Sequence, residues 1–199
     1  MKVADLPYDA ATWWMMYLYK FMLSAIVTSV LNLIGPLLNP ARPRRQLIGV
    51  FAPWLTPVLA EVLRELGRDR AWVVHGLADS EAGLDDISIS GATTIADLEA
   101  ARINSAVLDV AWIGIPRAPL DDLRGGDAHE DAKTIEGILS AEIAGAKRDS
   151  VIANAAAGFV VAGLAQELNA GIALAREQID SGHALERLRA VRSYASNAA

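Results

Sequence analysis

Cysteine is absent from the 199-residue chain, and histidine occurs only three times, at His75, His129 and His183. Without cysteine, the chain has no disulfides, no thiolate metal sites and no cysteine nucleophile. The histidines lie far apart and show no metal-ligand spacing, so we do not expect a histidine-rich metal site. Acidic residues outnumber basic ones, 24 to 18, and the net charge is −6. This argues against a nucleic-acid partner held by phosphate neutralisation.

Apolar residues are abundant and are concentrated near the start of the chain. They make up 53% of the sequence, and Thr12–Leu38 reads TWWMMYLYKFMLSAIVTSVLNLIGPLL with Lys20 as its single charge. One interpretation is a helix buried in the protein or covered by a partner; the other is a membrane or interfacial segment. Lys20 inside the run and Gly35–Pro36 at its end weigh against a membrane span. We therefore divide the chain into an apolar helical segment, residues 1–38, and an α/β domain, residues 39–199.

The first part of the α/β domain has the pattern of a strand–helix–strand unit. Gln46–Phe51 and Ala71–His75 are short apolar runs typical of buried strands. Between them, apolar residues recur at helical spacing from Pro53 to the stop at Gly67. Such a unit has parallel strands. The sequence therefore predicts an α/β fold with part of a mainly parallel sheet flanked by helices.

Further along the chain, the patterns predict one more strand and then mostly helices. Ile87–Ser90 alternates apolar and polar residues, as a half-buried strand does. Downstream we expect a short helix at Thr93–Arg102 and a strand or extended segment at Ala106–Gly114. Four helices should follow: one opened by a capping box of Asp127 and Glu130, two capped by Asp149 and Asn169, and a last one from His183.

Two adjacent carboxylates, Asp85 and Asp86, form the main candidate site. They lie in a glycine-supported loop that follows the predicted strand Ala71–His75, and ligands of open α/β sheets bind beyond the carboxyl ends of the strands. The alternative is an ordinary solvated turn. His75, at a strand end, is expected to be a hydrogen-bonded scaffold residue rather than an acid or base.

Other charged residues have simpler interpretations. Asp121 and Asp122 are expected to be solvated loop charges. Arg42, Arg44 and Arg45 are either a phosphate-attracting cluster or the surface charges of a proline-punctuated linker. No catalytic residue can be assigned from these patterns.

Several segments, taken together and in order, resemble the second half of anthranilate phosphoribosyltransferase. They are NLIGPLLNPARPRRQLIGVF (32–51), VVHG (73–76), GLDDISISGATTIADL (83–98), GIPRAPLDDLRGGDAHEDA (114–132), RDSVIANAAAGFVVAG (148–163) and ALAREQIDSGHALERLRAVRSY (173–194). They cover about five-sixths of the chain. This agreement in order makes the resemblance specific.

The resemblance implies transfer of a phosphoribosyl group from phosphoribosyl pyrophosphate to the amine of anthranilate, in cytoplasmic tryptophan biosynthesis. It also implies Mg²⁺ held by a loop in which the family has an aspartate followed by a glutamate. Those positions are Asp85 and Asp86 here, and carboxylate oxygens suit this cation. Asp86 departs from the family here, since its side chain is one methylene shorter than the family's glutamate.

The chain also departs from the family. The glycine-rich loop that cradles the pyrophosphate and the acceptor-binding residues belong to the family's first half, and Asp131 replaces an expected asparagine. Three hypotheses follow: an enzyme chain whose first half is supplied by another polypeptide, a non-catalytic remnant or binding module, and a membrane-associated protein anchored by Thr12–Leu38. Self-association into a homo-oligomer is a further expectation. Under each hypothesis, we expect the chain by itself to be inactive.

Overall fold

A computed structural model describes residues 35–79 and 82–197 of the chain. The chain divides into two units, Met1–Arg42 and Pro43–Ala199. In the first unit, only residues 35–42 are described, and Gly35–Leu38 form turns. The predicted apolar helix therefore lies almost wholly outside the described residues. Within those residues, no helix is long and apolar enough to cross a membrane.

The predicted strand–helix–strand unit is confirmed. Strand β1 (Arg45–Gly49) pairs in parallel with β2 (Arg70–Leu77). Helix α2 (Leu55–Glu65) connects them and buries Leu55, Leu59 and Leu63. These side chains recur every four residues, so they lie on one face of the helix and cover the sheet.

The rest of the sheet is antiparallel, so the prediction of a mainly parallel sheet is wrong. Strand β4 (Thr93–Glu99) pairs antiparallel with β2 and with β5 (Arg102–Leu108), and the two-residue β3 (Gly83–Leu84) also pairs antiparallel with β2. The strand order is β1-β2-β4-β5. The sheet is mixed because no helical crossover separates β2 from β4, and a parallel connection requires one.

The predicted helix at Thr93–Arg102 is wrong for a related reason. β4 and β5 form a hairpin whose two-residue turn is Ala100–Ala101, with φ values of 49° and 63°. Turns with two positive φ values normally carry Asn or Gly. A pair of alanines does not indicate such a turn, and the high helical propensity of alanine favours a helix instead.

Ile87–Ser90 is not a strand but an irregular, buried segment. Ser88 organises it. The Ser88 hydroxyl donates to the Leu77 carbonyl at 2.5 Å and accepts from the Ser90 and Gly91 N–H groups, while the Ser88 N–H donates to Thr93 Oγ1. The apolar–polar alternation therefore reflects local side-chain hydrogen bonding rather than a pleated strand.

The C-terminal part is helical, as predicted, with different helix starts. Helix α3 (Ala128–Leu139) has the Asp127–Glu130 capping box, which is confirmed. Helix α4 (Ala146–Ala162) begins after Gly145, so Asp149 lies in its first turn and is not its cap. Helix α5 (Leu168–Asp180) follows Glu167 rather than Asn169. Helix α6 (His183–Asn197) starts where predicted.

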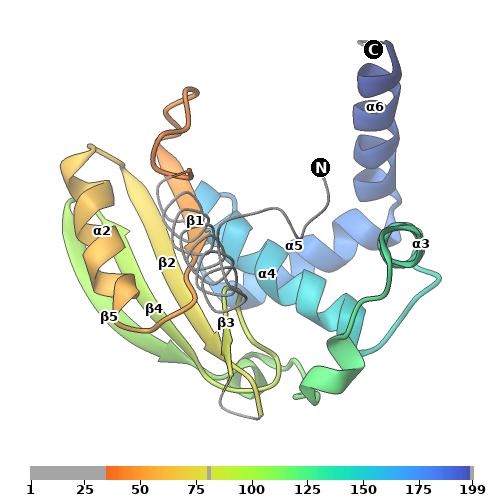
Figure 1. The fold of residues 1–199 in the computed structure, drawn as a ribbon, viewed down its shortest axis with the longest axis horizontal. Helices are drawn as coiled ribbons and strands as arrows, with labels where there is room; N and C mark the ends of the chain where they lie inside the picture. The colour runs from red at the N-terminus through yellow and green to blue at the C-terminus, as the bar shows by residue number, and fades with distance from the viewer. Residues whose placement is uncertain (1–34, 80–81, 198–199) are drawn as a thin grey trace, which may run out of the picture. The chain divides into compact units, whose positions relative to one another are not determined.

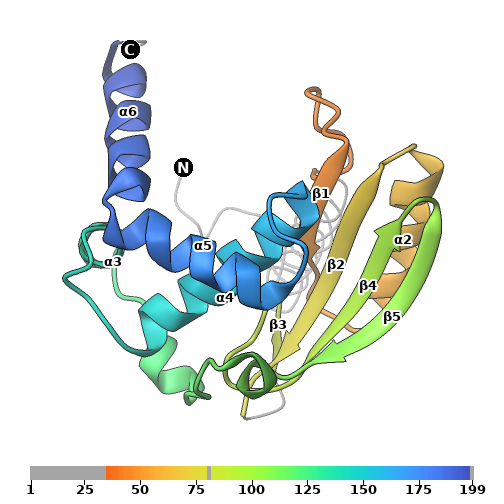
Figure 2. The same ribbon diagram turned by 180° about the vertical axis from the view of Figure 1, so that it is seen from behind.

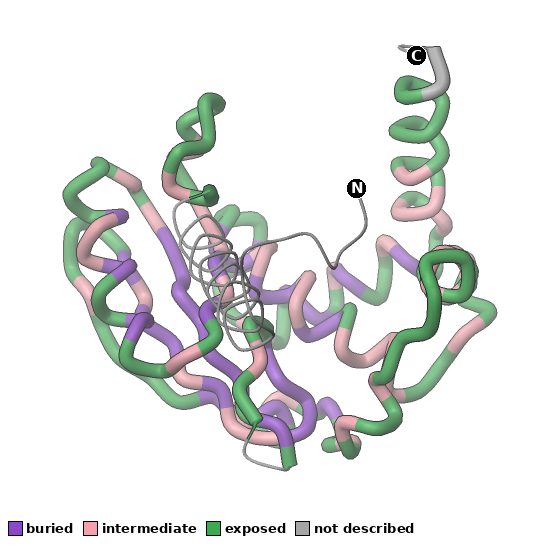
Figure 3. The backbone as a smooth tube through the Cα atoms, viewed as in Figure 1, coloured by how far each residue is buried: buried purple, intermediate pink, exposed green. Residues whose placement is uncertain are grey.

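Helices cover the two faces of the sheet at different strands (Figures 1 and 2). α2 packs against β2, β4 and β5 on one face, whereas α4 packs against β1 and β2 on the other. The main core lies between the sheet and α4, and it includes Trp72 and Val74 from β2 with Ala156 and Val160 from α4. Figure 3 shows this buried layer running along β2 and α4.

Candidate metal centre at the ends of β1 and β2

Asp85 and Asp86 directly follow β3, and their backbone lies against the carboxyl ends of β1 and β2. Two glycines make this approach possible. A Cβ atom on Gly49, the last residue of β1, would overlap the Asp85 carbonyl oxygen, and a Cβ on Gly76 would lie 2.6 Å from the Asp86 carbonyl oxygen. Real Cβ atoms do not approach backbone this closely, so glycine is needed at both strand ends.

Asn154 of α4 fixes the residue that follows the two aspartates. Its Oδ1 accepts from the Ile87 N–H at 2.9 Å, and its Nδ2 donates to the Ile87 carbonyl at 3.1 Å and to the Ser150 carbonyl at 3.0 Å. Ile87 is 1% exposed, so its backbone groups need these partners. No sequence pattern predicted this role; the available signal was one amide within the alanine-rich RDSVIANAAAG segment.

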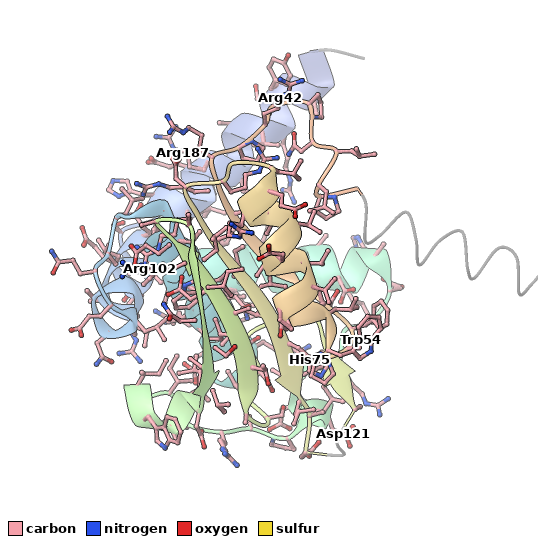
Figure 4. All side chains as sticks on the ribbon, turned by 90° about the vertical axis from the view of Figure 1, so that its left-hand side faces the viewer. Arg42, Trp54, His75, Arg102, Asp121 and Arg187 are labelled. Atoms are coloured by element: carbon pink, nitrogen blue, oxygen red, sulfur yellow. The ribbon has the colours of Figure 1, made fainter. Side chains whose placement is uncertain are left out.

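His75 has the scaffold environment expected of it. It is 2% exposed, and its Nδ1 lies 2.8 Å from the Val50 carbonyl. Because a carbonyl only accepts, Nδ1 carries the proton and donates. A Cβ on Gly83 would come within 2.6 Å of His75 Cε1, so the ring fills the space between β2 and β3. Figure 4 shows His75 at the same end of the sheet as Trp54 and Asp121.

The charges of the two aspartates are not compensated by the described part of the chain. Both residues are exposed, and none of the ion pairs among the described residues includes either of them. The surrounding protein partly removes water from the Asp86 carboxyl. This loss of hydration raises the Asp86 pKa, and repulsion from Asp85 raises it further. A bound cation would relieve that repulsion.

The donor set fits Mg²⁺ rather than a metal that requires a complete protein cage. Among the described residues, no group of three or more His, Asp or Glu side chains is placed to hold a metal. Two adjacent carboxylates remain, and Mg²⁺ commonly takes one or two carboxylates and fills its other positions with water and substrate phosphate. The structure brings Asp85 and Asp86 together on one short loop, and the metal assignment itself stays a prediction.

The other charged residues that the sequence singled out are not part of the Asp85–Asp86 loop. Arg44 pairs with Asp69 at 2.7 Å, and the Arg45 guanidinium donates to the Ala162 carbonyl. Both arginines are thus engaged in contacts within the protein. This favours the structural interpretation of the linker charges over a phosphate-attracting cluster.

The acidic residues outside the main loop also have local explanations. Asp121 and Asp122 are exposed, as expected, and Asp121 pairs with Arg124 at 2.7 Å. Asp131, the departure from the family pattern, accepts a hydrogen bond from the Gly126 N–H at 2.8 Å. An asparagine side-chain oxygen would accept the same bond. The substitution is therefore compatible with the loop.

The chain belongs to a family of glycosyltransferases. Residues 18–185 match the glycosyl transferase family, a/b domain. The chain is 46% identical over 162 residues to an anthranilate phosphoribosyltransferase of Rhodopseudomonas palustris, and 47% identical over 167 residues to one of Rhizobium rhizogenes. These matches cover 81% and 82% of this chain but only 46% and 47% of the relatives. The chain thus spans about half the length of the curated relatives it matches.

Solved structures agree with this assignment. The chain is similar to the anthranilate phosphoribosyltransferase of Thermus thermophilus, with 36% identity and a TM-score of 0.71 over 79% of this chain and 45% of that one. It also shares its fold with the Saccharomyces cerevisiae enzyme in complex with PRPP and Mg, at 22% identity and a TM-score of 0.63, over 73% of this chain and 41% of that one. These likenesses support the α/β architecture.

Proposed function

We propose that the chain supplies the magnesium-binding part of a phosphoribosyltransferase that joins the phosphoribosyl group of phosphoribosyl pyrophosphate to the amine of anthranilate. The observation that carries the proposal is the pair Asp85–Asp86, two carboxylates in no ion pair of the described residues, on a loop whose backbone lies against the ends of β1 and β2. The identity to anthranilate phosphoribosyltransferases supports the choice of substrates. We assign the reaction to cytoplasmic tryptophan biosynthesis.

In this proposal, the Asp85 and Asp86 carboxylates hold Mg²⁺, which when bound would neutralise charge on the pyrophosphate leaving group. The surrounding residues fix the backbone of the loop that carries the two carboxylates. Gly49 and Gly76 let the loop lie on the strand ends, and Asn154 fixes its next residue. A loop whose backbone is already in place needs less reorganisation when a ligand binds, which favours catalysis by electrostatic stabilisation.

We infer that this chain by itself binds the donor weakly and does not turn over. The resemblance places the donor cradle and the acceptor pocket in a part of the relatives that this chain does not match. Positioning of reactants contributes roughly 7–11 kcal/mol to such reactions, and two aspartates do not replace it.

The metal assignment can be tested by calorimetric titration of Mg²⁺ with phosphoribosyl pyrophosphate. We expect Asp85→Asn and Asp86→Asn each to weaken Mg²⁺-dependent binding at least tenfold, whereas Asp122→Asn, an exposed control in another loop, leaves it unchanged. Asp86→Glu restores the family's longer side chain and is expected to bind at least as tightly as wild type. Equal binding by wild type and both Asn variants would refute the site.

The second test measures formation of phosphoribosyl anthranilate with and without a polypeptide carrying the unmatched part of the Rhodopseudomonas palustris relative. Turnover only in the mixture is the expected result. Steady turnover by the purified chain alone, abolished in Asp85→Asn, would show that the inference of inactivity is wrong. Donor binding without turnover in the mixture would favour a non-catalytic binding module.

A further inference from the structure

A small pocket between α3 and the start of α4 includes neither aspartate of the candidate metal centre. Its volume is about 270 Å³, just below the range of about 300–1,000 Å³ that is usual for pockets of drug-sized ligands. The pocket is therefore of a size that suits a small metabolite. Both charged and apolar side chains line it, among them Asp131, Lys147, Leu123 and Ile135.

Two opposite charges line this pocket without neutralising each other. Asp131 lies on α3 and Lys147 on α4, and both are partly buried. Neither belongs to an ion pair of the described residues. Asp131 Oδ1 accepts from the Gly126 N–H at 2.8 Å, which leaves Oδ2 for another donor. Because withdrawing a charge from water is costly unless the charge is paired, this arrangement suits a ligand that carries both complementary charges.

The negative charge of Asp131 is not required by the local fold. Asp131 replaces the asparagine of the family pattern, and an asparagine oxygen would accept the same hydrogen bond from the Gly126 N–H. The carboxylate therefore gives the pocket a charge that this hydrogen bond does not need. Since the charge faces the same pocket as the Lys147 ammonium, it points to an occupant rather than to a structural role.

We propose that this pocket binds a small zwitterion, an α-amino acid with an aliphatic side chain. The ligand's ammonium donates to the Asp131 carboxylate, and its carboxylate accepts from the Lys147 ammonium. Its side chain packs on Leu123 and Ile135, the apolar part of the lining. The proposal makes no use of Asp85 or Asp86, so it can fail or succeed independently of the proposed function.

The first test is calorimetry of the full chain with L-leucine as the probe, in the absence of Mg²⁺ and phosphoribosyl pyrophosphate. Two analogues separate the charges of the ligand: N-acetyl-L-leucine lacks the ammonium, and L-leucinamide lacks the carboxylate. We expect each analogue to bind wild type at least about tenfold more weakly than L-leucine does, because each loses one of the two charge-assisted hydrogen bonds.

The second test removes the charges of the protein one at a time. Asp131→Asn keeps the acceptor for the Gly126 N–H; it should weaken L-leucine binding at least about tenfold and leave N-acetyl-L-leucine binding unchanged. Lys147→Met should weaken L-leucine binding to the same degree and leave L-leucinamide binding unchanged. The matched controls are Glu177→Gln and Lys133→Met, at exposed positions that do not line the pocket. They should leave L-leucine binding unchanged.

Equal binding of L-leucine by wild type, Asp131→Asn and Lys147→Met overturns the proposal, as does the absence of a binding heat at millimolar L-leucine. Equally tight binding of L-leucinamide also overturns it, because the site would then recognise a simple ammonium. Thermal denaturation separates lost binding from lost folding. Asp131→Asn is expected to melt close to wild type, since the hydrogen bond from Gly126 persists. If that variant does not fold, the comparison of the three ligands on wild type decides by itself.

Discussion

Loss of the Asn154 side chain should destabilise the chain through the loop that carries the two aspartates. Asn154→Ala removes the acceptor of the Ile87 N–H and the donor to the Ile87 carbonyl. Ile87 is 1% exposed, so neither group regains water easily. A buried polar group left without its partner costs about 1–3 kcal/mol. Because two such groups lose their partner, we expect a total of about 2–6 kcal/mol.

This loss is a large share of the roughly 5–15 kcal/mol by which domains are typically stable, so urea denaturation followed by circular dichroism will detect it. Val151→Ala on the same helix is the control, because Val151 is partly exposed and makes no such bond; it should cost under about 1 kcal/mol. A decrease below about 0.5 kcal/mol for Asn154→Ala would refute the conclusion that this amide holds the loop.

Three further predictions concern neighbouring features. Gly49→Ala should lower stability by about 1–3 kcal/mol through overlap with the Asp85 backbone, whereas Gly158→Ala should not lower it; thermal denaturation of both variants checks this. Asp127→Ala should cost about 0.5–2 kcal/mol by removing the capping box of α3, as urea denaturation would show. Asp85→Asn should lower the raised pKa of Asp86 toward its usual value, because it removes one of the two causes; an NMR titration of the Asp86 carboxyl would contradict this if the pKa did not move.

The raised pKa of Asp86 also has a consequence for stability. A carboxyl whose pKa is higher in the folded chain binds its proton more tightly there than in the unfolded chain. Its ionisation therefore lowers the stability of the folded chain at pH values above the folded-state pKa. This loss of stability disappears as the pH falls to the pKa of Asp86 in the unfolded chain. The effect is small because Asp86 is exposed.

Elements specified by close neighbours in the sequence were predicted correctly. The strand–helix–strand unit follows from apolar spacing within single turns and strands, and the start of α3 follows from a capping box whose two members are close in sequence. The choice of Asp85 and Asp86 also came from local signals, their position after a strand and the resemblance of the surrounding motif, and it stays a prediction. Each of these signals lies within a few neighbouring residues, so it can be recognised from the sequence alone.

Pairings and contacts across the chain were decided only by tertiary structure. Ala100–Ala101 adopts positive φ because β4 and β5 pair along seven residues each, and this pairing outweighs the helical preference of alanine. The support of the site is equally non-local: Asn154 bonds Ile87 across 67 residues, and Gly49 and Gly76 are required by the loop that lies on them. No local sequence pattern specifies these contacts, because the residues come together only when the sheet and α4 pack.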